Sequence, residues 1–391
     1  MRVLIVTKIF PNAAEPLSSP FNRQQFAALG RRCHVEVLAT IPWFPGASVF
    51  GRWSTAGRLA AVPRTEVIDG LTVAHPRFVY LPRVAVGTQG ALYAASVAAE
   101  AIRRRGRFDV LLGSWAYPDG VATVALARLM GVPAVVKVHG SDLNVIAKMN
   151  GAAANLRWAL PRARRVVAVS RPLADEVASY GVPRERIDVV ANGVDSELFR
   201  PADRAAARAE LGRAGDSARW ILYVGRLVDF KGVLELLAAF GELAGRRPDV
   251  RLVLVGDGNA RAECQAAAAR LGGDRLLVVG ARPLEEVPRW MAACDVLTLP
   301  SWNEGTPNVL LEALACGRRV VATSVGGIPD VVAAPALGEL VPVRDPPALA
   351  AALGRAVDAA YDPDEVARAG ARGGWAESAA RLEASLRAAV A

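Results

Sequence analysis

Two glutamates lie in the stretch Ser301–Gly317, SWNEGTPNVLLEALACG, with seven residues between them. Glu304 precedes a run whose apolar residues recur at helical spacing, and Glu312 lies within that run. Thr306 can cap a helix and Pro307 suits the first helical position, where a missing N–H costs nothing. We therefore predict a helix that begins at one of these two residues and ends at the closing glycine of the stretch.

A helix N-terminus flanked by two carboxylates favours one kind of ligand. The free N–H groups and the helix dipole attract a phosphate group. Carboxylates repel phosphate and are better suited to neutral hydroxyl groups. A ligand with phosphate in the middle and hydroxyls at both ends, such as a nucleotide-sugar, matches this layout. The alternative is a capping carboxylate followed by an ordinary helix glutamate, since for either residue taken alone that is the better interpretation.

Two cations stand five residues apart in YVGRLVDFKG, directly after the first strand expected in the second half of the chain. They are Arg226 and Lys231. The loop after a strand in a parallel sheet lies at the ligand-binding edge, so both cations could reach a diphosphate there. The alternative is that Lys231 only opens a solvated helix.

His139 follows a predicted strand, Ala134–Val138, in the first half of the chain. It too is expected at the carboxyl edge of a sheet. There it could donate a hydrogen bond to a sugar hydroxyl, or offer its backbone carbonyl to developing positive charge. A satisfied core histidine is the alternative.

Short apolar β-rich runs alternate with helical patterns along both halves of the chain, which predicts two parallel sheets covered by helices on both faces. The fold class is therefore α/β, with two Rossmann-like, doubly wound domains facing a cleft. We predict a first domain at 1–198, a linker at 199–218 that is polar and rich in Ala and Arg, and a second domain at 219–374. A last helix at about 375–391 could pack back onto the first domain.

The chain has 391 residues and a net charge of +9. Residues 1–200 hold 25 Lys+Arg against 14 Asp+Glu, and residues 201–391 hold 22 against 24. A basic first half predicts an anionic partner, either a membrane surface or a phosphate-bearing acceptor. The loop Ile41–Arg64 mixes aromatic residues with arginines and suits such a surface. No nucleic-acid-binding motif accompanies the charge, so nucleic acid is not an expected partner. A solvated arginine surface is the alternative.

The four cysteines have neither disulfide-like nor zinc-like spacing, so no metal site is predicted. The first apolar run is too short for a signal peptide, and no apolar run reaches 18 residues. The sequence therefore predicts a cytoplasmic protein, peripheral on the inner face of the membrane if the basic half binds lipid. Gly256–Arg261, GDGNAR, lacks the third glycine of a dinucleotide fingerprint, which disfavours an NAD enzyme.

Five motifs resemble one known family, and they span nearly the whole chain. They are FPNAAEP (10–16), HGSD (139–142), NGVD (192–195), GRLVDFKG (225–232) and EGTPNVLLEALACG (304–317). Together they look like a retaining glycosyltransferase of family 4, with the GT-B fold. The first loop, LSSPFNRQQ (17–25), further resembles a subgroup that acts in surface-polysaccharide or envelope-glycan assembly.

The resemblance implies a nucleotide-sugar donor in the second domain and an acceptor in the first. It implies that Arg226 and Lys231 hold the diphosphate, that Glu312 binds the ribose hydroxyls and that Glu304 binds the hydroxyls of the donor sugar. His139 would lie close to the sugar, so His139 and Glu304 are the candidate catalytic residues. The donor-binding segment further includes Gly305, Thr306, Pro307, Asn308 and Val309.

The chain departs from the family in its first loop. A glycine usually lets that backbone approach the donor phosphate, whereas this chain has Ser19 and Pro20, and Pro20 has no N–H to donate. These two residues are a possible donor loop of the first domain.

The function implied is transfer of a sugar, with retention of anomeric configuration and without a metal or other cofactor. The donor would be a UDP-sugar rather than a GDP-sugar, and the acceptor a hydroxyl of a glycan, a lipid-linked molecule or another small molecule. The alternatives are a nucleotide-sugar 2-epimerase on the same fold and a non-catalytic nucleotide-sugar binder.

Overall fold

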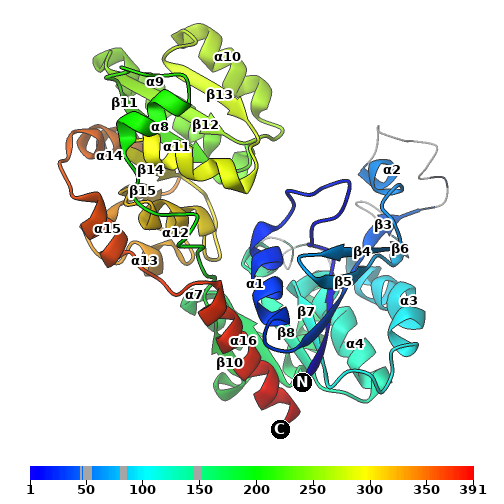
Figure 1. The fold of residues 1–391 in the computed structure, drawn as a ribbon. Helices are drawn as coiled ribbons and strands as arrows, with labels where there is room; N and C mark the ends of the chain where they lie inside the picture. The colour runs from blue at the N-terminus through cyan, green and yellow to red at the C-terminus, as the bar shows by residue number, and fades with distance from the viewer. Residues whose placement is uncertain (45, 47–54, 80–85, 145, 147–148, 150) are drawn as a thin grey trace. The chain divides into compact units, whose positions relative to one another are not determined.

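A computed structural model describes residues 1–44, 46, 55–79, 86–144, 146, 149 and 151–391. The chain forms two compact units. The first comprises Met1–Gly193 with Trp375–Ala391, and the second comprises Val194–Gly374 (Figure 1). Each is an α/β unit built on a sheet whose strands are all or mostly parallel, as the alternating pattern predicts.

Among the described residues, the main sheet of the first unit has eight strands in the order β10-β9-β8-β7-β1-β2-β5-β4. All neighbours pair in parallel except β4 and β5, which are antiparallel. A smaller sheet pairs β3 (Ile41–Trp43) with β6 (Arg77–Val79). The strands of the main sheet are β1 (Arg2–Thr7), β2 (His34–Ala39), β4 (Thr65–Ile68), β5 (Leu71–Ala74), β7 (Val110–Ser114), β8 (Ala134–Val138), β9 (Arg165–Ala168) and β10 (Ile187–Val189).

Helices cover both faces of this sheet because its central strands are apolar on both sides. One face packs against α1 (Pro20–Gly30) and α16 (Trp375–Val390), which also pack on each other. The chain thus returns from the second unit to complete the first. The remaining helices of this unit are α2 (Thr55–Leu59), α3 (Gln89–Ile102), α4 (Val121–Met130), α5 (Ser141–Asn144), α6 (Ala152–Ala159) and α7 (Arg171–Ser179).

The sheet of the second unit has six parallel strands among the described residues, in the order β13-β12-β11-β14-β15-β16. The order reverses beside β11, which is where ligands bind in doubly wound sheets. The strands are β11 (Arg219–Val224), β12 (Val250–Val255), β13 (Leu276–Gly280), β14 (Val296–Leu299), β15 (Val320–Thr323) and β16 (Gly338–Val341).

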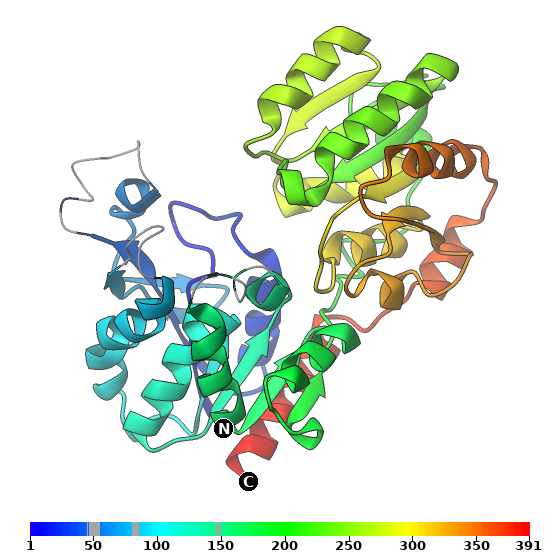
Figure 2. The ribbon, with the colours of Figure 1, turned by 180° about the vertical axis from the view of Figure 1, so that it is seen from behind.

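Helices also enclose the second sheet, and α9 packs against α14 on one face (Figure 2). Its fully buried strand residues, such as Ile221 and Val253, explain the continuous apolar runs in the sequence. The helices are α8 (Arg204–Glu210), α9 (Val233–Arg246), α10 (Arg261–Leu271), α11 (Val287–Ala293), α12 (Asn308–Ala315), α13 (Ile328–Val331), α14 (Pro346–Asp358) and α15 (Pro363–Ala369).

The prediction of a linker at 199–218 is wrong, because this segment belongs to the second unit. Its helix α8 packs against α11. Arg208 donates to the buried carboxylate of Asp295 over 2.9 Å, and that carboxylate also accepts the Trp220 backbone N–H over 2.7 Å. The arginines that made the segment look polar therefore anchor it to the sheet.

No helix among the described residues is both long and apolar enough to cross a membrane.

Candidate functional site

The carboxyl ends of β11 and β14 lie side by side in the second unit, because these strands are neighbours and run in parallel. The loop after β11 carries Arg226 and Lys231, and the loop after β14 carries Glu304. The structure brings the two loops together through an ion pair between the Lys231 Nζ and the Glu304 Oε1. Residues separated by about seventy positions in the sequence thus form one charged group.

The Glu304 carboxylate is held firmly. Its side chain is only 9 % exposed, and that of Lys231 is 20 % exposed. The Ser301 hydroxyl donates to the same carboxylate oxygen over 2.7 Å. A carboxylate accepts about four hydrogen bonds, so oxygen lone pairs remain for the hydroxyl groups of a ligand.

Arg226 lies beside this pair, with its guanidinium over the Phe230 ring, 5.2 Å from the centroid. The Tyr223 hydroxyl donates to the Arg226 carbonyl over 2.7 Å, and the Trp302 backbone N–H donates to the Phe230 carbonyl over 2.9 Å. The Tyr223 bond fixes the backbone of Arg226 within its own loop, and the Trp302 bond joins the two loops. They hold a second cation at the same edge of the sheet, where a diphosphate could be bound by both.

Two glycines allow the loops to approach this closely. A Cβ on Gly232, whose φ is +70°, would lie 1.9 Å from the Pro300 carbonyl oxygen. A Cβ on Gly326 would lie 1.8 Å from the carbonyl oxygen of Glu304. Any side chain at these positions would therefore move the backbone that carries the ion pair.

The helix after Glu304 is α12, and it begins at Asn308. Pro307 occupies the capping position with an extended backbone, so the prediction that the helix begins at Thr306 or Pro307 is wrong by one or two residues. The segment from Gly305 to Val309 nevertheless forms the N-terminal entrance of this helix. Backbone N–H groups at such an entrance favour a phosphate group.

Glu312 lies in the second turn of α12 and is partly buried. Loss of surrounding water raises the pKa of its carboxyl group to about 7. A carboxyl group with so high a pKa is costly to ionise, and donor groups from a ligand would offset that cost.

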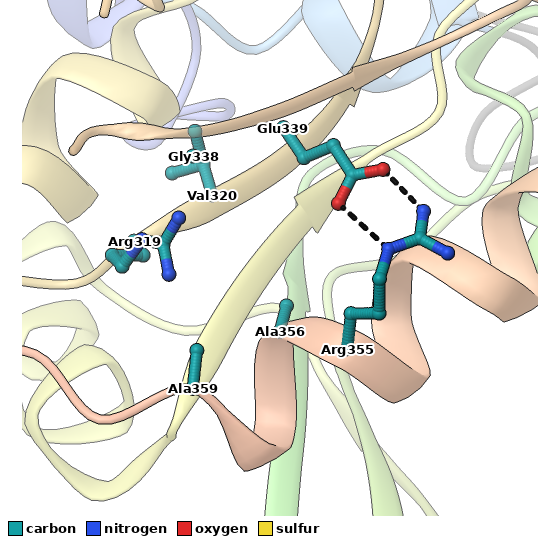
Figure 3. Close-up of a pocket in the computed structure, with 7 residues that line it drawn as sticks. All are labelled: Arg319, Val320, Gly338, Glu339, Arg355, Ala356 and Ala359. Carbon is teal, nitrogen blue, oxygen red and sulfur yellow. Dashed lines mark hydrogen bonds and ion pairs between the residues drawn. The ribbon is translucent and has the colours of Figure 1, made fainter. Parts of the chain in front are cut away.

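A small pocket of about 90 Å³ also lies in the second unit, where Arg355 forms an ion pair with Glu339 (Figure 3). Val320 and Gly338 line it, and they are the first residues of β15 and β16. This pocket is therefore at the amino edge of the sheet, opposite the loops that carry Glu304 and Lys231.

In the first unit, His139 follows β8 at the carboxyl edge of the sheet. Its Nε2 lies 3.0 Å from the Ser114 Oγ. Its ring lies 5.7 Å from the Trp115 ring and 5.2 Å from the Phe21 ring, centroid to centroid. Its backbone N–H donates to the Asp142 carboxylate, with 3.1 Å from the nitrogen to each carboxylate oxygen. The loop and the ring are thus both fixed.

The imidazole is held in its neutral form. Burial, together with the nearby ammonium group of Lys137, moves the pKa of His139 well below its ordinary value. Burial likewise lowers the pKa of Lys137 to about 7. The ring can therefore take part in hydrogen bonds with one N–H and one lone pair.

Sequence reasoning missed Ser114, Trp115 and Asn22. Trp115 has a φ of +129°, which is rare for a residue with a side chain, and strain of this kind clusters at functional sites. Its buried indole N–H makes no hydrogen bond within the described part of the chain. Ser114 is the last residue of the apolar strand β7 and Trp115 follows it, so the strand-end signal used for His139 also applies to this pair, whereas Asn22 lies within α1 and has no such signal.

The possible donor loop of the first unit adopts an unusual backbone. Ser19 has φ +48° and ψ +54°, the left-handed region that glycine favours, and Pro20 is the first residue of α1. The serine thus takes a conformation that a glycine would adopt without strain.

No cluster of three or more His, Cys, Asp or Glu side chains suited to a metal ion occurs within the described ranges.

Comparison with known proteins places the chain in one family. Residues 28–198 match the model described as Glycosyltransferase Family 4, and residues 218–359 match the model described as Glycosyl transferases group 1. A D-inositol 3-phosphate glycosyltransferase of Thermobispora bispora is 35 % identical over 318 residues, which cover 72 % of this chain and 71 % of the relative. TuaC of Bacillus subtilis, whose provisional name is a teichuronic acid biosynthesis glycosyltransferase, is 29 % identical and covers 84 % of this chain and 82 % of its own.

A solved structure of Anabaena Alr3699/HepE in complex with UDP has the same fold, with a TM-score of 0.73. It is 21 % identical and covers 99 % of this chain and 100 % of its own. The same Anabaena protein has also been solved with UDP-glucose. With its GT-B fold and its match to curated relatives over most of their length, this chain belongs to glycosyltransferase family 4.

Proposed function

We propose that the protein transfers a sugar from a UDP-sugar to an acceptor hydroxyl, with retention of configuration. The observation that carries this proposal is the Lys231–Glu304 ion pair, beside Arg226 and at the entrance of α12. Cations and helix N–H groups suit a diphosphate, and a firmly held carboxylate suits sugar hydroxyls. No other group of residues described above combines cations and helix N–H groups with a firmly held carboxylate.

Each residue has a separate role in the proposal. Lys231 and Arg226 bind the diphosphate and stabilise the negative charge that develops as it leaves. The segment Gly305–Val309 adds backbone N–H groups to the phosphate. Glu304 accepts hydrogen bonds from the donor sugar, and Glu312 accepts them from the ribose.

The choice of UDP is supported by the solved Anabaena relatives, which hold UDP and UDP-glucose. A retaining mechanism is supported by the resemblance to the family. The acceptor hydroxyl would attack from the face that the leaving diphosphate occupies. The cations of this chain can neutralise the diphosphate themselves, so we propose that no metal or other cofactor is required.

The acceptor is proposed to be a glycan, a lipid-linked molecule or another small hydroxylated molecule in bacterial polysaccharide or envelope-glycan synthesis. The names of two relatives support these acceptor classes, since one is named for D-inositol 3-phosphate and the other for teichuronic acid biosynthesis.

Cytoplasmic location with peripheral binding to an anionic membrane remains part of the proposal. It rests on the basic first half of the chain, where 25 Lys+Arg face 14 Asp+Glu. Trp43 of the aromatic and basic loop is 38 % exposed. Phe50 and Trp53 of that loop lie outside the described residues. Flotation with anionic and neutral vesicles tests this part, and no binding to anionic vesicles at low salt would refute it.

One experiment separates a transferase from a 2-epimerase and from a non-catalytic binder. The protein is incubated with UDP-glucose and with UDP-N-acetylglucosamine, each with and without D-inositol 3-phosphate, and released UDP is measured. We expect release to rise with acceptor and to resist EDTA. Release in water at the same rate with no acceptor would favour the epimerase, and an unchanged donor in every mixture, despite binding, would favour the binder.

A further inference from the structure

A chain of hydrogen bonds connects α1 to the imidazole ring of His139. The Asn22 side-chain Nδ2 donates to the Ile9 carbonyl over 2.8 Å. The Asn22 Oδ1 lies 3.2 Å from the Ser114 Oγ, and the Ser114 Oγ lies 3.0 Å from the His139 Nε2. Asn22 and Ser114 are both fully buried. The three side chains come from α1, β7 and the end of β8.

The direction of each bond in this chain follows from its fixed end. A backbone carbonyl can only accept, so the Asn22 atom facing Ile9 is the NH₂ group and the atom facing Ser114 is the oxygen. That oxygen can only accept, so the Ser114 hydroxyl donates to it. The Ser114 Oγ has only one proton, and its lone pair is therefore directed to His139, whose Nε2 must carry a proton.

We propose that Asn22 and Ser114 are positioning residues that hold His139 in the tautomer protonated at Nε2, so that Nδ1 presents a lone pair to a substrate hydroxyl. The part of this proposal that concerns substrate rests on the proposed function. The sequence suggested that His139 donates to a sugar hydroxyl. The hydrogen-bond chain assigns its ring the opposite role, as an acceptor.

The surroundings of the ring agree with a single neutral form. The titratable groups close to it are the Lys137 amine, whose pKa burial lowers to about 7, and the Asp142 carboxyl group. The carboxylate accepts the backbone N–H groups of Ala116, His139 and Gly140, and is therefore occupied by the loop rather than by the ring. A second proton on the imidazole would meet the lysine and have no carboxylate to pair with.

Lys137 is itself fixed by the helices on this face of the sheet. Its Nζ donates to the Gln25 Oε1 over 2.5 Å, and the Gln25 Nε2 donates to the Ser378 Oγ over 2.8 Å. α1 therefore supports the histidine through Asn22 and the cation beside it through Gln25, and α16 supports Gln25 through Ser378.

The tautomer can be measured directly by long-range proton–nitrogen correlation NMR on protein labelled with ¹⁵N-histidine. The chain has three histidines, and His139→Ala identifies the signals of His139. His75 is an internal control, because its Nδ1 lies 2.8 Å from the Ala39 carbonyl and must be protonated there. We expect His139 to show a protonated Nε2 and an unprotonated Nδ1. A protonated Nδ1, or an even mixture, would overturn the proposal.

Two variants test the roles of the neighbours in the same experiment. Asn22→Leu releases the Ser114 hydroxyl to donate to Nε2, so we expect the Nδ1-protonated form to appear. Ser114→Ala removes the acceptor and should also mix the tautomers, whereas Ser114→Thr keeps a hydroxyl and should restore the original form. Ser179→Ala is the matched control, since its exposed hydroxyl bonds to the Glu176 carbonyl away from this chain. Unchanged tautomers in the first two variants would contradict the assigned roles.

Activity supplies an independent test through a double-mutant cycle, with UDP release from UDP-glucose and D-inositol 3-phosphate as the assay. We expect Ser114→Ala to lower kcat about 10-fold, the effect of one lost hydrogen bond partner, with KM changed less. In the His139→Ala background it should have no further effect. If Ser114→Ala lowered kcat equally in the wild type and in His139→Ala, Ser114 would have a structural role that does not act through His139. If the wild type does not use this donor, the proposed function fails for it, and the NMR result still decides the tautomer.

Discussion

The two candidate sites of this protein are built on opposite electrostatic principles. In the second unit, Lys231 and Glu304 are both charged and pair with each other at a sheet edge. In the first unit, His139 is held neutral by burial and by a lysine, within a chain of neutral hydrogen bonds. Charges suit a diphosphate that leaves with added negative charge, whereas a neutral acceptor suits an uncharged hydroxyl. Two units of similar architecture thus present a charged site in one case and a neutral hydrogen-bonding site in the other.

The largest effect should come from removing the charge of the second unit. We expect Lys231→Ala to lower UDP release from UDP-glucose and D-inositol 3-phosphate by at least ~100-fold, because the leaving diphosphate loses its cation. Glu304→Ala should cause a similar loss, since the sugar loses its acceptor. Steady-state kinetics at saturating donor measures both.

The matched control is Arg355→Ala, which breaks an ion pair at the amino edge of the same sheet. Its turnover should stay within a factor of two or so of the wild type, since an exposed ion pair contributes about 0–1 kcal/mol. Comparable losses in Arg355→Ala and Lys231→Ala would mean that the charge effect is not specific to the carboxyl edge.

A smaller effect is expected on stability at Glu312, whose pKa is raised to about 7 in the folded protein. Between the ordinary carboxyl value and 7, the folded state binds more protons than the unfolded state. The free energy of unfolding therefore falls as pH rises through this window. Glu312→Gln removes the dependence and should be more stable than the wild type at pH 8, on the order of 1 kcal/mol or more.

Denaturant unfolding at pH 5 and pH 8 checks the Glu312 prediction, with Glu365→Gln as a control carboxyl group in the exposed first turn of α15. Equal pH dependence in the wild type and Glu312→Gln would show that this carboxyl group is not the cause. Adding UDP should restore stability to the wild type at pH 8, because we expect the ribose hydroxyls to donate hydrogen bonds to the Glu312 carboxylate.

The smallest effect is expected in the first unit at Ser19. The left-handed backbone costs a residue with a side chain about 1–2 kcal/mol, and glycine avoids most of this at some entropic cost in the unfolded chain. We expect Ser19→Gly to stabilise the protein by less than about 1 kcal/mol. Ser18→Gly, which replaces a residue with an ordinary φ, should destabilise it. Thermal unfolding of both variants measures the difference, and a destabilised Ser19→Gly would contradict the assignment of strain.

The fold class followed from the sequence because continuous apolar strands alternate with helices, and that prediction is confirmed. The family prediction is confirmed as well. The linker prediction failed because pattern alone does not show that Arg208 meets Asp295, 87 positions away. Its polar composition resembled a solvated connection, while its arginines are partners of a buried carboxylate.

The two candidate sites differ in how much of them the sequence could show. Arg226, Lys231, Glu304 and Glu312 are charged residues next to strand ends or within a helical pattern, and such positions can be recognised along the chain. Ser114 and Asn22 are small polar residues on an apolar strand and an ordinary helix. Their importance depends on which atom faces which, and only the three-dimensional arrangement gives that.

Titration of UDP into the wild type and into Lys231→Ala, with EDTA present, tests the proposed donor site most directly. We expect saturable binding of UDP to the wild type, unaffected by EDTA. We expect binding at least ~10-fold weaker in the variant, because one charged hydrogen bond contributes about 1.5–3 kcal/mol. Absence of UDP binding to the wild type, or equal affinity in the two proteins, would contradict the assignment of the Lys231 and Glu304 loops as the donor site.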